Sequence, residues 1–419
     1  MRLTIHLDTV LLSVLTLPAL AACGGRSNVE CQQNSNCDLA VGGVCQSAAT
    51  GNRWCAYPDL SCPGGYRYSD EQVGDGVAGT CVPMVAGSAG ATDAGSSPPV
   101  VSCLALLPTC GVHADDDCCA SLEVPGGTYF RAFDLAGDAN SGNQSAPATV
   151  SAFRLDKYEV TVGRFRAFVA AGQGTQANPP PVGSGAHPRL PGSGWEIGWN
   201  TGLQATLQAF AAVIHCSEHP EFSTWSTWTD QPGPNENRPM NCISWYEAMA
   251  FCIWDGGYLP TEAEWNFAAS GGDEQRAYPW SSPAGSLALD SSRASYATYD
   301  SQTGIHCLGN GMPDCVVTDL VNVGNFPAGD GRFGQSDLAG NVAEWTLDSF
   351  GDGTLPVPCV DCANFAAPGH AVTRGASFID SGLLYFRSGN RLYQASDYHA
   401  YFYGVRCARP AARSPSPPG

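Results

Sequence analysis

A nine-residue segment, DLAGNVAEW, combines residue types and spacing that suit a hard metal cation. Asp337 and Glu344 supply carboxylates at its first and eighth positions, and Gly340 and Val342 can supply backbone carbonyl oxygens between them. Ca²⁺ takes about six to eight oxygen ligands, often from side chains and carbonyls that alternate along a short loop. The segment therefore predicts a structural calcium site, because a filled oxygen cage leaves no open position for a substrate. The alternative is a capped turn with a buried glutamate.

Two other motifs could hold a metal or carry redox chemistry. Cys359 and Cys362 form a CxxC pattern, which is either a reactive thiol pair or a set of structural disulfide cysteines. The disulfide interpretation is favoured in an exported, cysteine-rich chain. His215 and His219 are four residues apart, a zinc-like spacing on a helix. Pro220 follows directly, so we expect a loop with solvated histidines.

The N-terminus has the pattern of an export signal. Residues 1–22 contain a positive start and an apolar stretch that is too short to span a membrane comfortably. The segment ends in Leu-Ala-Ala-Cys, which resembles a bacterial lipobox and predicts lipidation of Cys23. The alternative is an ordinary signal peptide with a chance cysteine. Gly24 favours the outer membrane, so we expect an outer-membrane or cell-surface lipoprotein of a Gram-negative bacterium, held by its lipid.

The composition supports export and argues against one class of partner. Without Cys23, 18 of the 19 cysteines remain, an even number that favours disulfides. The net charge of −19 argues against nucleic acid, whose phosphates need a basic surface. With 49 glycines and 30 prolines, we expect many turns and short elements.

The chain divides into segments of different composition. A lipidated tether, 23–30, precedes a module with six cysteines at 31–82, which is too small to bury much core and must depend on crosslinks. A zinc site is the weaker alternative there, because the spacings lack close CxxC pairs. A small, polar linker follows at 83–100, then a large domain at 101–410 and a disordered tail at 411–419.

Two helices of the large domain carry start and stop signals. Ser244 and Glu247 form a capping box, which predicts a helix that reaches about Trp254 and stops at a pair of glycines. Thr261 and Glu264 form a second capping box, and this helix also ends before two glycines.

The other elements of this domain are shorter. The patterns predict strands in 125–130 and 153–161 and a helix over 162–170. The adjacent Cys118 and Cys119 are expected to bond to two different partners. Most of the remaining sequence has no regular periodicity, so we expect an irregular α+β domain held by aromatic packing, disulfides and ions.

Eight segments occur in the order found in one enzyme family. By these segments the chain resembles the formylglycine-generating enzymes, or sulfatase-modifying factors, over about 280 residues. LPTEAEW and GNVAEW are the most specific of them. The resemblance implies a compact fold of low secondary-structure content, related to C-type lectins. The segments are PGGTYF, DKYEVTVGRFRAF, RPMNCISWYEAMAFCIW, GYLPTEAEW, AYPW, DLAGNVAEW, RGAS and GVRCA.

The resemblance also implies a reaction that this chain lacks the ligands to perform. The family oxidises a substrate cysteine to formylglycine with copper and O₂, and two cysteines after a Gly-Gly-Ser motif bind the copper. Here that motif is 375–377, and the two positions fall on Asp380 and at about Tyr385. Cu(I) is a soft ion that needs soft thiolates. Copper binding is therefore not expected, and the family's tryptophan is also missing at Ala343.

Other family features map onto this chain in part. The resemblance implies a disulfide between Cys252 and Cys407. A second family disulfide maps to Ala269 and a position near Gly389, where both cysteines are absent. The family's other calcium site does not map, because the segment 291–319 is rearranged.

A group of polar residues follows the Gly-Gly-Ser position. Ser377, Asp380, Arg387 and Arg391, together with Asn390, fall where the family's substrate groove lies. The guanidinium groups of the arginines and the carboxylate could bind a polar ligand there. The same residues could equally be ordinary surface residues.

Two functions remain open from the sequence. The favoured one is an exported lipoprotein with a calcium-stabilised domain that binds or displays a ligand, either an extracellular protein or a small molecule. The alternative is a divergent metal-dependent oxidoreductase that acts on an extracytoplasmic substrate. The alternative predicts a metal with open coordination near Asp380.

Overall fold

The computed structural model describes residues 31, 37, 44–48, 52–58, 66–70, 73–82, 100–104, 106–137, 143–218, 220–312, 314–365 and 369–412. These residues form two compact units, a smaller one within 31–82 and a larger one from residue 100 onward. The predicted signal peptide, lipidated Cys23, the tether and the linker up to residue 99 lie outside the described residues. Of the predicted tail, residues 413–419 also lie outside them.

The smaller unit contains a three-stranded sheet in which β1 and β2 are antiparallel. Its strands are β1 (Val44–Ser47), β2 (Arg53–Pro58) and β3 (Tyr66–Tyr68), in that spatial order. A disulfide joins Cys37 to Cys55, and the buried Trp54 donates its indole N–H to Asp75 at 2.8 Å. The crosslink agrees with the expectation that so small a module depends on disulfides.

The larger unit is α+β, with short elements and long irregular connections, as predicted. Its helices are α1 (Val162–Ala170), α2 (Leu207–Val213), α3 (Trp245–Trp254) and α4 (Glu262–Ala269). Its strands are β4 (Ser121–Val124), β5 (Gly127–Phe130), β6 (Pro147–Val150), β7 (Phe153–Asp156), β8 (Ala297–Asp300), β9 (Gly304–Cys307), β10 (Ala343–Ser349), β11 (Cys359–Val360), β12 (His370–Arg374), β13 (Leu392–Ala395), β14 (Tyr403–Gly404) and β15 (Ala408–Pro410). Short 3₁₀ turns include η3 (Ile197–Gly202).

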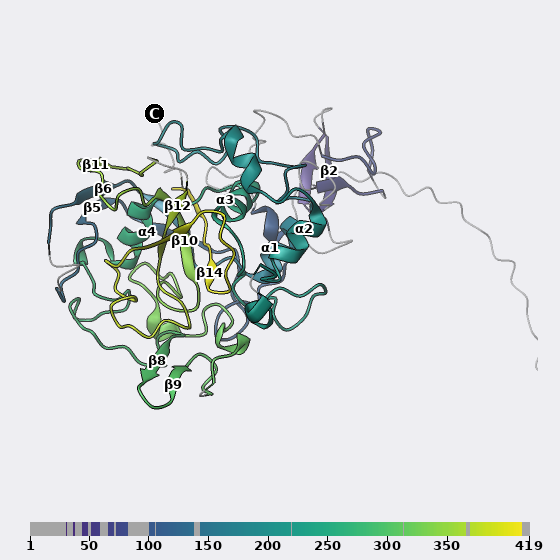
Figure 1. Ribbon diagram of the computed structural model, residues 1–419. Coiled ribbons are helices and arrows are strands. Elements are labelled where there is room, and N and C mark those ends of the chain that lie inside the picture. Colours follow the sequence, from purple (N-terminus) through teal and green to yellow (C-terminus); the bar gives the residue numbers. More distant parts are fainter. Residues whose placement is uncertain are drawn as a thin grey trace, which may run out of the picture. The chain divides into compact units, whose positions relative to one another are not determined.

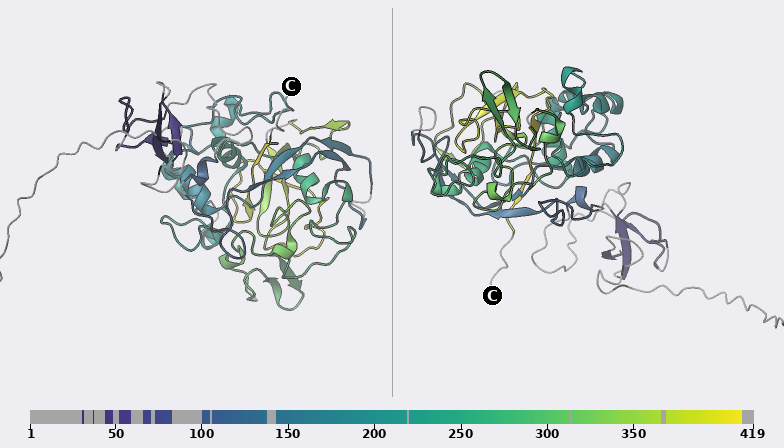
Figure 2. Two further views of the ribbon diagram at one scale, coloured as in Figure 1. Left: turned by 180° about the vertical axis from the view of Figure 1, so that it is seen from behind. Right: turned by 90° about the horizontal axis from the view of Figure 1, so that it is seen from below.

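A four-stranded sheet at the centre of the larger unit positions the site residues. Its strand order is β13-β12-β10-β14, with β10 antiparallel to β12 and parallel to β14. Both α3 and α4 contact β10, and Figure 1 shows β10 and β12 between α4 on one side and α1 to α3 on the other. In both views of Figure 2 the teal helices α1 to α3 lie together on one side of this unit. The described residues of this unit also form the three-stranded sheets β11-β6-β5 and β15-β7-β4 and the two-stranded sheet β8-β9.

Both predicted capping boxes are present, and both helices begin where they were expected. The Ser244 hydroxyl accepts the Glu247 amide while the Glu247 carboxylate accepts the Ser244 amide, so α3 starts at Trp245. Thr261 and Glu264 cap α4 in the same reciprocal way. Such boxes satisfy amides that the first helical turn leaves without an intrahelical partner, which is why they are readable from local sequence.

The predicted strand over 153–161 is longer than the observed one. Regular pairing stops at Asp156, and Val160 then bonds by its amide to the carbonyl of Val405 before Thr161 caps α1. The chain leaves the sheet here because Thr161 must adopt the extended N-cap conformation and accept the Arg164 amide. The helix predicted over 162–170 is confirmed as α1.

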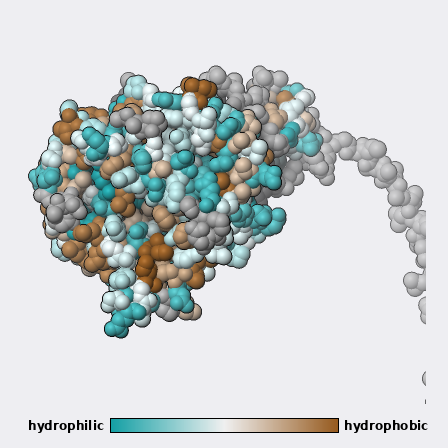
Figure 3. Space-filling model, viewed as in Figure 1, coloured by the Kyte–Doolittle hydropathy of each residue, from teal (hydrophilic) through white to brown (hydrophobic). Residues whose placement is uncertain are grey.

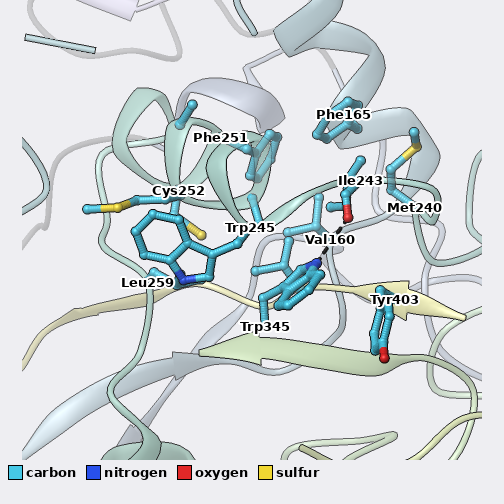
Figure 4. Packing of buried hydrophobic residues seen from close by; sticks show 14 of the residues in the cluster. Val160, Phe165, Met240, Ile243, Trp245, Phe251, Cys252, Leu259, Trp345 and Tyr403 are labelled. Atoms are coloured by element: carbon cyan, nitrogen blue, oxygen red, sulfur yellow. Dashed lines mark hydrogen bonds between the residues drawn. The ribbon is translucent and has the colours of Figure 1, made fainter. Parts of the chain in front are cut away.

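Aromatic and aliphatic side chains from distant segments form the main core. Figure 4 shows Val160, Phe165, Ile243 and Trp345 packed between α1, α3 and the central sheet. The indole N–H of Trp345 donates to the carbonyl of Ile243 at 3.0 Å, so the polar edge of this buried ring is satisfied. The main core thus includes Trp345, the last residue of the predicted calcium segment.

Six disulfides crosslink the larger unit, and every cysteine from Cys103 to Cys407 is in one of them. Cys118 and Cys119 bond to two different partners, as expected. The CxxC cysteines form a local bond with each other, which favours the structural interpretation of that motif. The six pairs are Cys103–Cys119, Cys110–Cys118, Cys216–Cys242, Cys252–Cys407, Cys307–Cys315 and Cys359–Cys362.

The surface of the larger unit is mixed. Figure 3 shows apolar and polar residues interleaved on the face viewed, and the lower projection, where Figure 1 places β8 and β9, ends in hydrophilic residues. Within the ranges described here, none of the helices combines the length and the apolar character needed to span a bilayer.

Candidate functional site

The predicted calcium segment forms a tight loop that leads into β10. Asp337 and Asn341 have positive φ angles of 57° and 60°. Gly340 has φ of 91°, and a Cβ there would lie 2.3 Å from the carbonyl oxygen of Ser295. Only glycine fits this close approach of two backbones. The amide of Gly340 donates to the carbonyl of Gly375, and the amide of Val342 donates to the carboxylate of Glu159. These hydrogen bonds do not use the carbonyls of Gly340 and Val342, which are the predicted calcium ligands.

The two predicted carboxylate ligands have different partners in this loop. Asp337 is buried and accepts the amide of Gly324 at 2.6 Å. Glu344 is fully buried, and both of its oxygens accept from the guanidinium of Arg406, at 2.6 and 2.7 Å. The indole N–H of Trp265 donates to Glu344 at 2.7 Å. Arg406, which lies 62 residues further along the chain, therefore fixes the orientation of Glu344.

A third buried carboxylate, Glu159, belongs to the same cluster. It accepts the side-chain amide of Asn341 at 2.7 Å and the backbone amide of Val342 at 3.1 Å. Burial, followed by the negative charges of Asp337 and Glu344, raises the pKa of Glu159 well above its usual value. Sequence reasoning missed this residue, although its place between Tyr158 and Val160, inside a predicted strand, was a signal for it.

The charge balance of this cluster fits a divalent cation. Glu159, Asp337 and Glu344 are three buried carboxylates, and Arg406 is the cation that pairs with one of them. Burial raises the pKa of Asp337 to about 6. Burying a carboxylate without a counter-charge costs folding free energy. A hard cation would offset that cost, because it binds carboxylate and carbonyl oxygens such as those of this cluster. The donor set therefore suits Ca²⁺, and Asp337 and Glu344 with the carbonyls of Gly340 and Val342 would hold it.

The residues predicted to line a groove have a different role in the structure. Ser377 is fully buried and donates its hydroxyl and its amide to Asp380 at 2.7 and 2.8 Å. Arg387 is 4% exposed and forms a two-point ion pair with the buried Asp134. Arg391 donates to both oxygens of the buried Glu262 at 2.7 and 2.8 Å. These contacts brace the 377–391 loop, and Ser377 and Arg387 are too buried to be ordinary surface residues. That the group lines a ligand groove stays a prediction.

The positions that align with the family's copper ligands carry oxygen groups. The carboxylate of Asp380 is bonded to Ser377, and burial raises the pKa of this aspartate above its usual value despite those hydrogen bonds. Tyr385 is 43% exposed. The positions of the lost family disulfide still lie close together, since the Ser388 hydroxyl donates to the Ala269 carbonyl. Thiolates that could hold Cu(I) are therefore not found among the described residues of this region.

The alternative metal motifs are used for other purposes. Cys216 is bonded to Cys242, and the ring of His215 pairs with the exposed Asp230 at 2.9 Å. His219 lies outside the described residues. Among the described side chains, two clusters have the spacing of a metal site, one around Cys31 and one around Cys103. The cysteines of both clusters are disulfide bonded, so they offer no thiolate.

Comparison with known proteins agrees with this architecture. The family model for the sulfatase-modifying factor enzyme 1-like domain matches residues 112–411. An inactive C-alpha-formylglycine-generating enzyme 2 from Mus musculus is 26% identical over 72% of this chain and 88% of its own length. A formylglycine-generating enzyme from Thermomonospora curvata is 28% identical over 68% of this chain and 91% of its own length.

A solved structure is also similar to this chain, at lower identity. PvdO from Pseudomonas aeruginosa is 20% identical and matches 70% of this chain and 94% of its own, with a TM-score of 0.44.

Proposed function

Because this chain belongs to the family of sulfatase-modifying factor enzyme 1-like domains, we propose that it is a divergent member that binds or displays a ligand and does not generate formylglycine. The observation that carries the proposal is the state of its cysteines. Each one from Cys103 to Cys407 is bonded in a disulfide, and the half-buried carboxylate of Asp380 stands where the family carries a copper-binding cysteine. The relative from Mus musculus, whose name describes it as inactive, supports the proposal that this chain does not generate formylglycine.

Copper affinity tests this proposal. In a competition titration against a chromogenic Cu(I) chelator, we expect the oxidised wild-type protein to leave the metal with the chelator, because carboxylate and phenol oxygens are poor ligands for a soft ion. Stoichiometric transfer of Cu(I) to the protein would support the alternative, a metal-dependent oxidoreductase.

We propose in addition that calcium binds the loop from Asp337 to Glu344 and stabilises the domain. The cluster of three buried carboxylates beside one guanidinium supports this role. At a calcium concentration of about 100 times the Kd, linkage predicts about 2.7 kcal/mol of stabilisation and a rise in Tm of about 5 °C. Chelation should reverse that rise in a calorimetric scan.

A charge-removing variant makes the calcium prediction specific. Asp337→Asn keeps the oxygen that accepts from Gly324 but removes the carboxylate charge. We expect its Tm to respond weakly to calcium, whereas Asp290→Asn, at an exposed aspartate, should respond like the wild type. An equal response in all three proteins would contradict the assignment.

We propose that the chain is exported and anchored to a membrane through a lipid on Cys23. The Leu-Ala-Ala-Cys sequence after an apolar segment supports this localisation, and Gly24 favours the outer membrane. In a Gram-negative host, the wild type should fractionate with the outer membrane and the Cys23→Ser variant should not. Recovery of both proteins in the soluble fraction would rule out the anchor.

A further inference from the structure

A pocket lies at the end of the central sheet that is remote from the predicted calcium loop. Strand β10 pairs with β12 along its length, through Glu344 and Arg374 at one end and Ser349 and Ala371 at the other. The calcium loop precedes the first end, whereas the pocket is lined by residues of the second, including Asp348. At about 3.3 Å per residue, the two sites are separated by most of the length of β10.

Three aromatic rings form one side of this pocket. Trp199 comes from η3, and Trp245 and Tyr246 form the first turn of α3. The ring of Trp245 lies perpendicular to both neighbours, at 5.1 Å and 90° to Trp199 and at 5.3 Å and 87° to Tyr246. A hydrogen bond of 2.8 Å from the Trp245 indole to the Thr346 carbonyl fixes its orientation. The walls are therefore preformed and meet at right angles, unlike a single flat stacking platform.

Two carboxylates line the same pocket. Glu196 is exposed at its rim, and Asp348 is buried at the end of β10. The two oxygens of Asp348 accept backbone amides from Asn364 at 2.8 Å and Glu262 at 2.6 Å, which hold the carboxylate in place. Among the described lining residues, the one basic side chain is His370, and lysine and arginine are absent.

We propose that this pocket binds a small organic ammonium group. Aromatic faces attract a cation through the ring quadrupole, and a partly desolvated site strengthens the attraction. The adjacent carboxylates supply the opposite charge. A neutral ligand would gain only the contact with the rings, so the combination of perpendicular rings with two acids selects for positive charge.

The state of Asp348 supports this assignment. Burial, followed by the nearby charge of Glu262, raises the pKa of Asp348 to about 7. The guanidinium groups of Arg374 and Arg391 pair with Glu262, which accepts from both. The charge of Arg391 offsets this rise only in part, and Asp348 forms no direct ion pair with a described residue. An ammonium group in the pocket would give it a close counter-charge.

The inference gives a ligand class to the ligand-binding role proposed above, and its test is independent of copper. Isothermal titration with choline and with its neutral isostere 3,3-dimethyl-1-butanol separates charge from shape. We expect choline to bind and the neutral alcohol to bind at least about tenfold more weakly. A tenfold ratio of affinities is what the loss of one strong cation–π contact would cause.

Variants locate the binding. Trp199→Ala should weaken choline binding by about tenfold, and Glu196→Gln, at an exposed position, by about threefold. Tyr299→Ala removes an exposed ring outside the pocket and should bind choline like the wild type.

Three results would overturn the assignment. The first is that the wild type does not bind choline at a choline concentration of about 10 mM. Another is equal binding of choline and the alcohol, and the third is unchanged affinity in both pocket variants. If one of these results is obtained and the protein takes no Cu(I) from the chelator, the ammonium assignment is wrong, whereas the proposal that the protein is not a copper oxidase is retained.

Discussion

Replacing Cys252 and Cys407 together with alanine is expected to lower the free energy of unfolding by about 5 kcal/mol. The bond joins α3 to the segment before β15 across a sequence separation of 155 residues. In the chain-entropy account, a long closed loop removes much conformational freedom from the unfolded state, so its loss is costly. Both cysteines are fully buried, so repacking around alanine adds to the effect. Urea unfolding at 25 °C without reductant measures the difference.

A second disulfide pair provides the control for loop length. Cys359 and Cys362 are only three positions apart in the sequence, and the same relation gives about 2 kcal/mol for replacing both with alanine. The ratio of the two losses matters more than either value. Equal losses from the two double variants would contradict the explanation by loop length.

Arg164→Met is expected to destabilise the larger unit by about 3–5 kcal/mol, because it leaves a buried charge without its partner. The guanidinium of Arg164 donates to Asp156 at 2.9 Å and to Asp255 at 2.7 Å, and all three side chains are fully buried. Arg409 completes the network by pairing with both aspartates. Two cations therefore balance two anions, and removal of one cation breaks that balance. The midpoint of urea unfolding at pH 7 gives the loss.

The pH dependence of that loss has a definite sign. Burial alone would raise the pKa of Asp156, but Arg164 and Arg409 outweigh burial and hold the pKa below its usual value. A carboxylate with a lowered pKa stabilises the folded state above its unfolded pKa of about 3.9, and this contribution fades as the pH falls further. The gap between wild type and Arg164→Met should therefore narrow toward pH 3.

The exposed pair of Arg293 with Asp290 serves as the control for the buried network. Arg293→Met should cost less than about 1 kcal/mol, because solvent screens an exposed ion pair. A loss from Arg164→Met no greater than that from Arg293→Met would refute the account of the network.

Local signals in the sequence predicted the parts of the fold that local interactions determine. The capping boxes at Ser244 and Thr261 located the starts of α3 and α4 because the bonding groups lie three residues apart. The family resemblance supplied the bond between Cys252 and Cys407, which the structure contains. Neither inference required knowledge of how distant segments pack.

Contacts between distant segments were not predictable in the same way. Glu159 reaches Asn341 across 182 residues, and Arg387 reaches Asp134 across 253. The sequence shows that the guanidinium of Arg387 can donate two parallel hydrogen bonds. It does not show that the buried Asp134 already accepts them. The sequence of this segment therefore predicts a groove of free polar groups, whereas the structure gives Arg387 and Arg391 buried carboxylate partners.

Conversion of a substrate peptide tests the central claim most directly. The purified protein is supplied with copper, O₂ and a peptide containing the Cys-x-Pro-x-Arg sequence, and the peptide is analysed by mass spectrometry for formylglycine. An active formylglycine-generating enzyme serves as the positive control. We predict that the peptide cysteine remains unchanged, because Asp380 cannot replace a thiolate as a copper ligand. Catalytic conversion of the peptide to formylglycine would contradict the account.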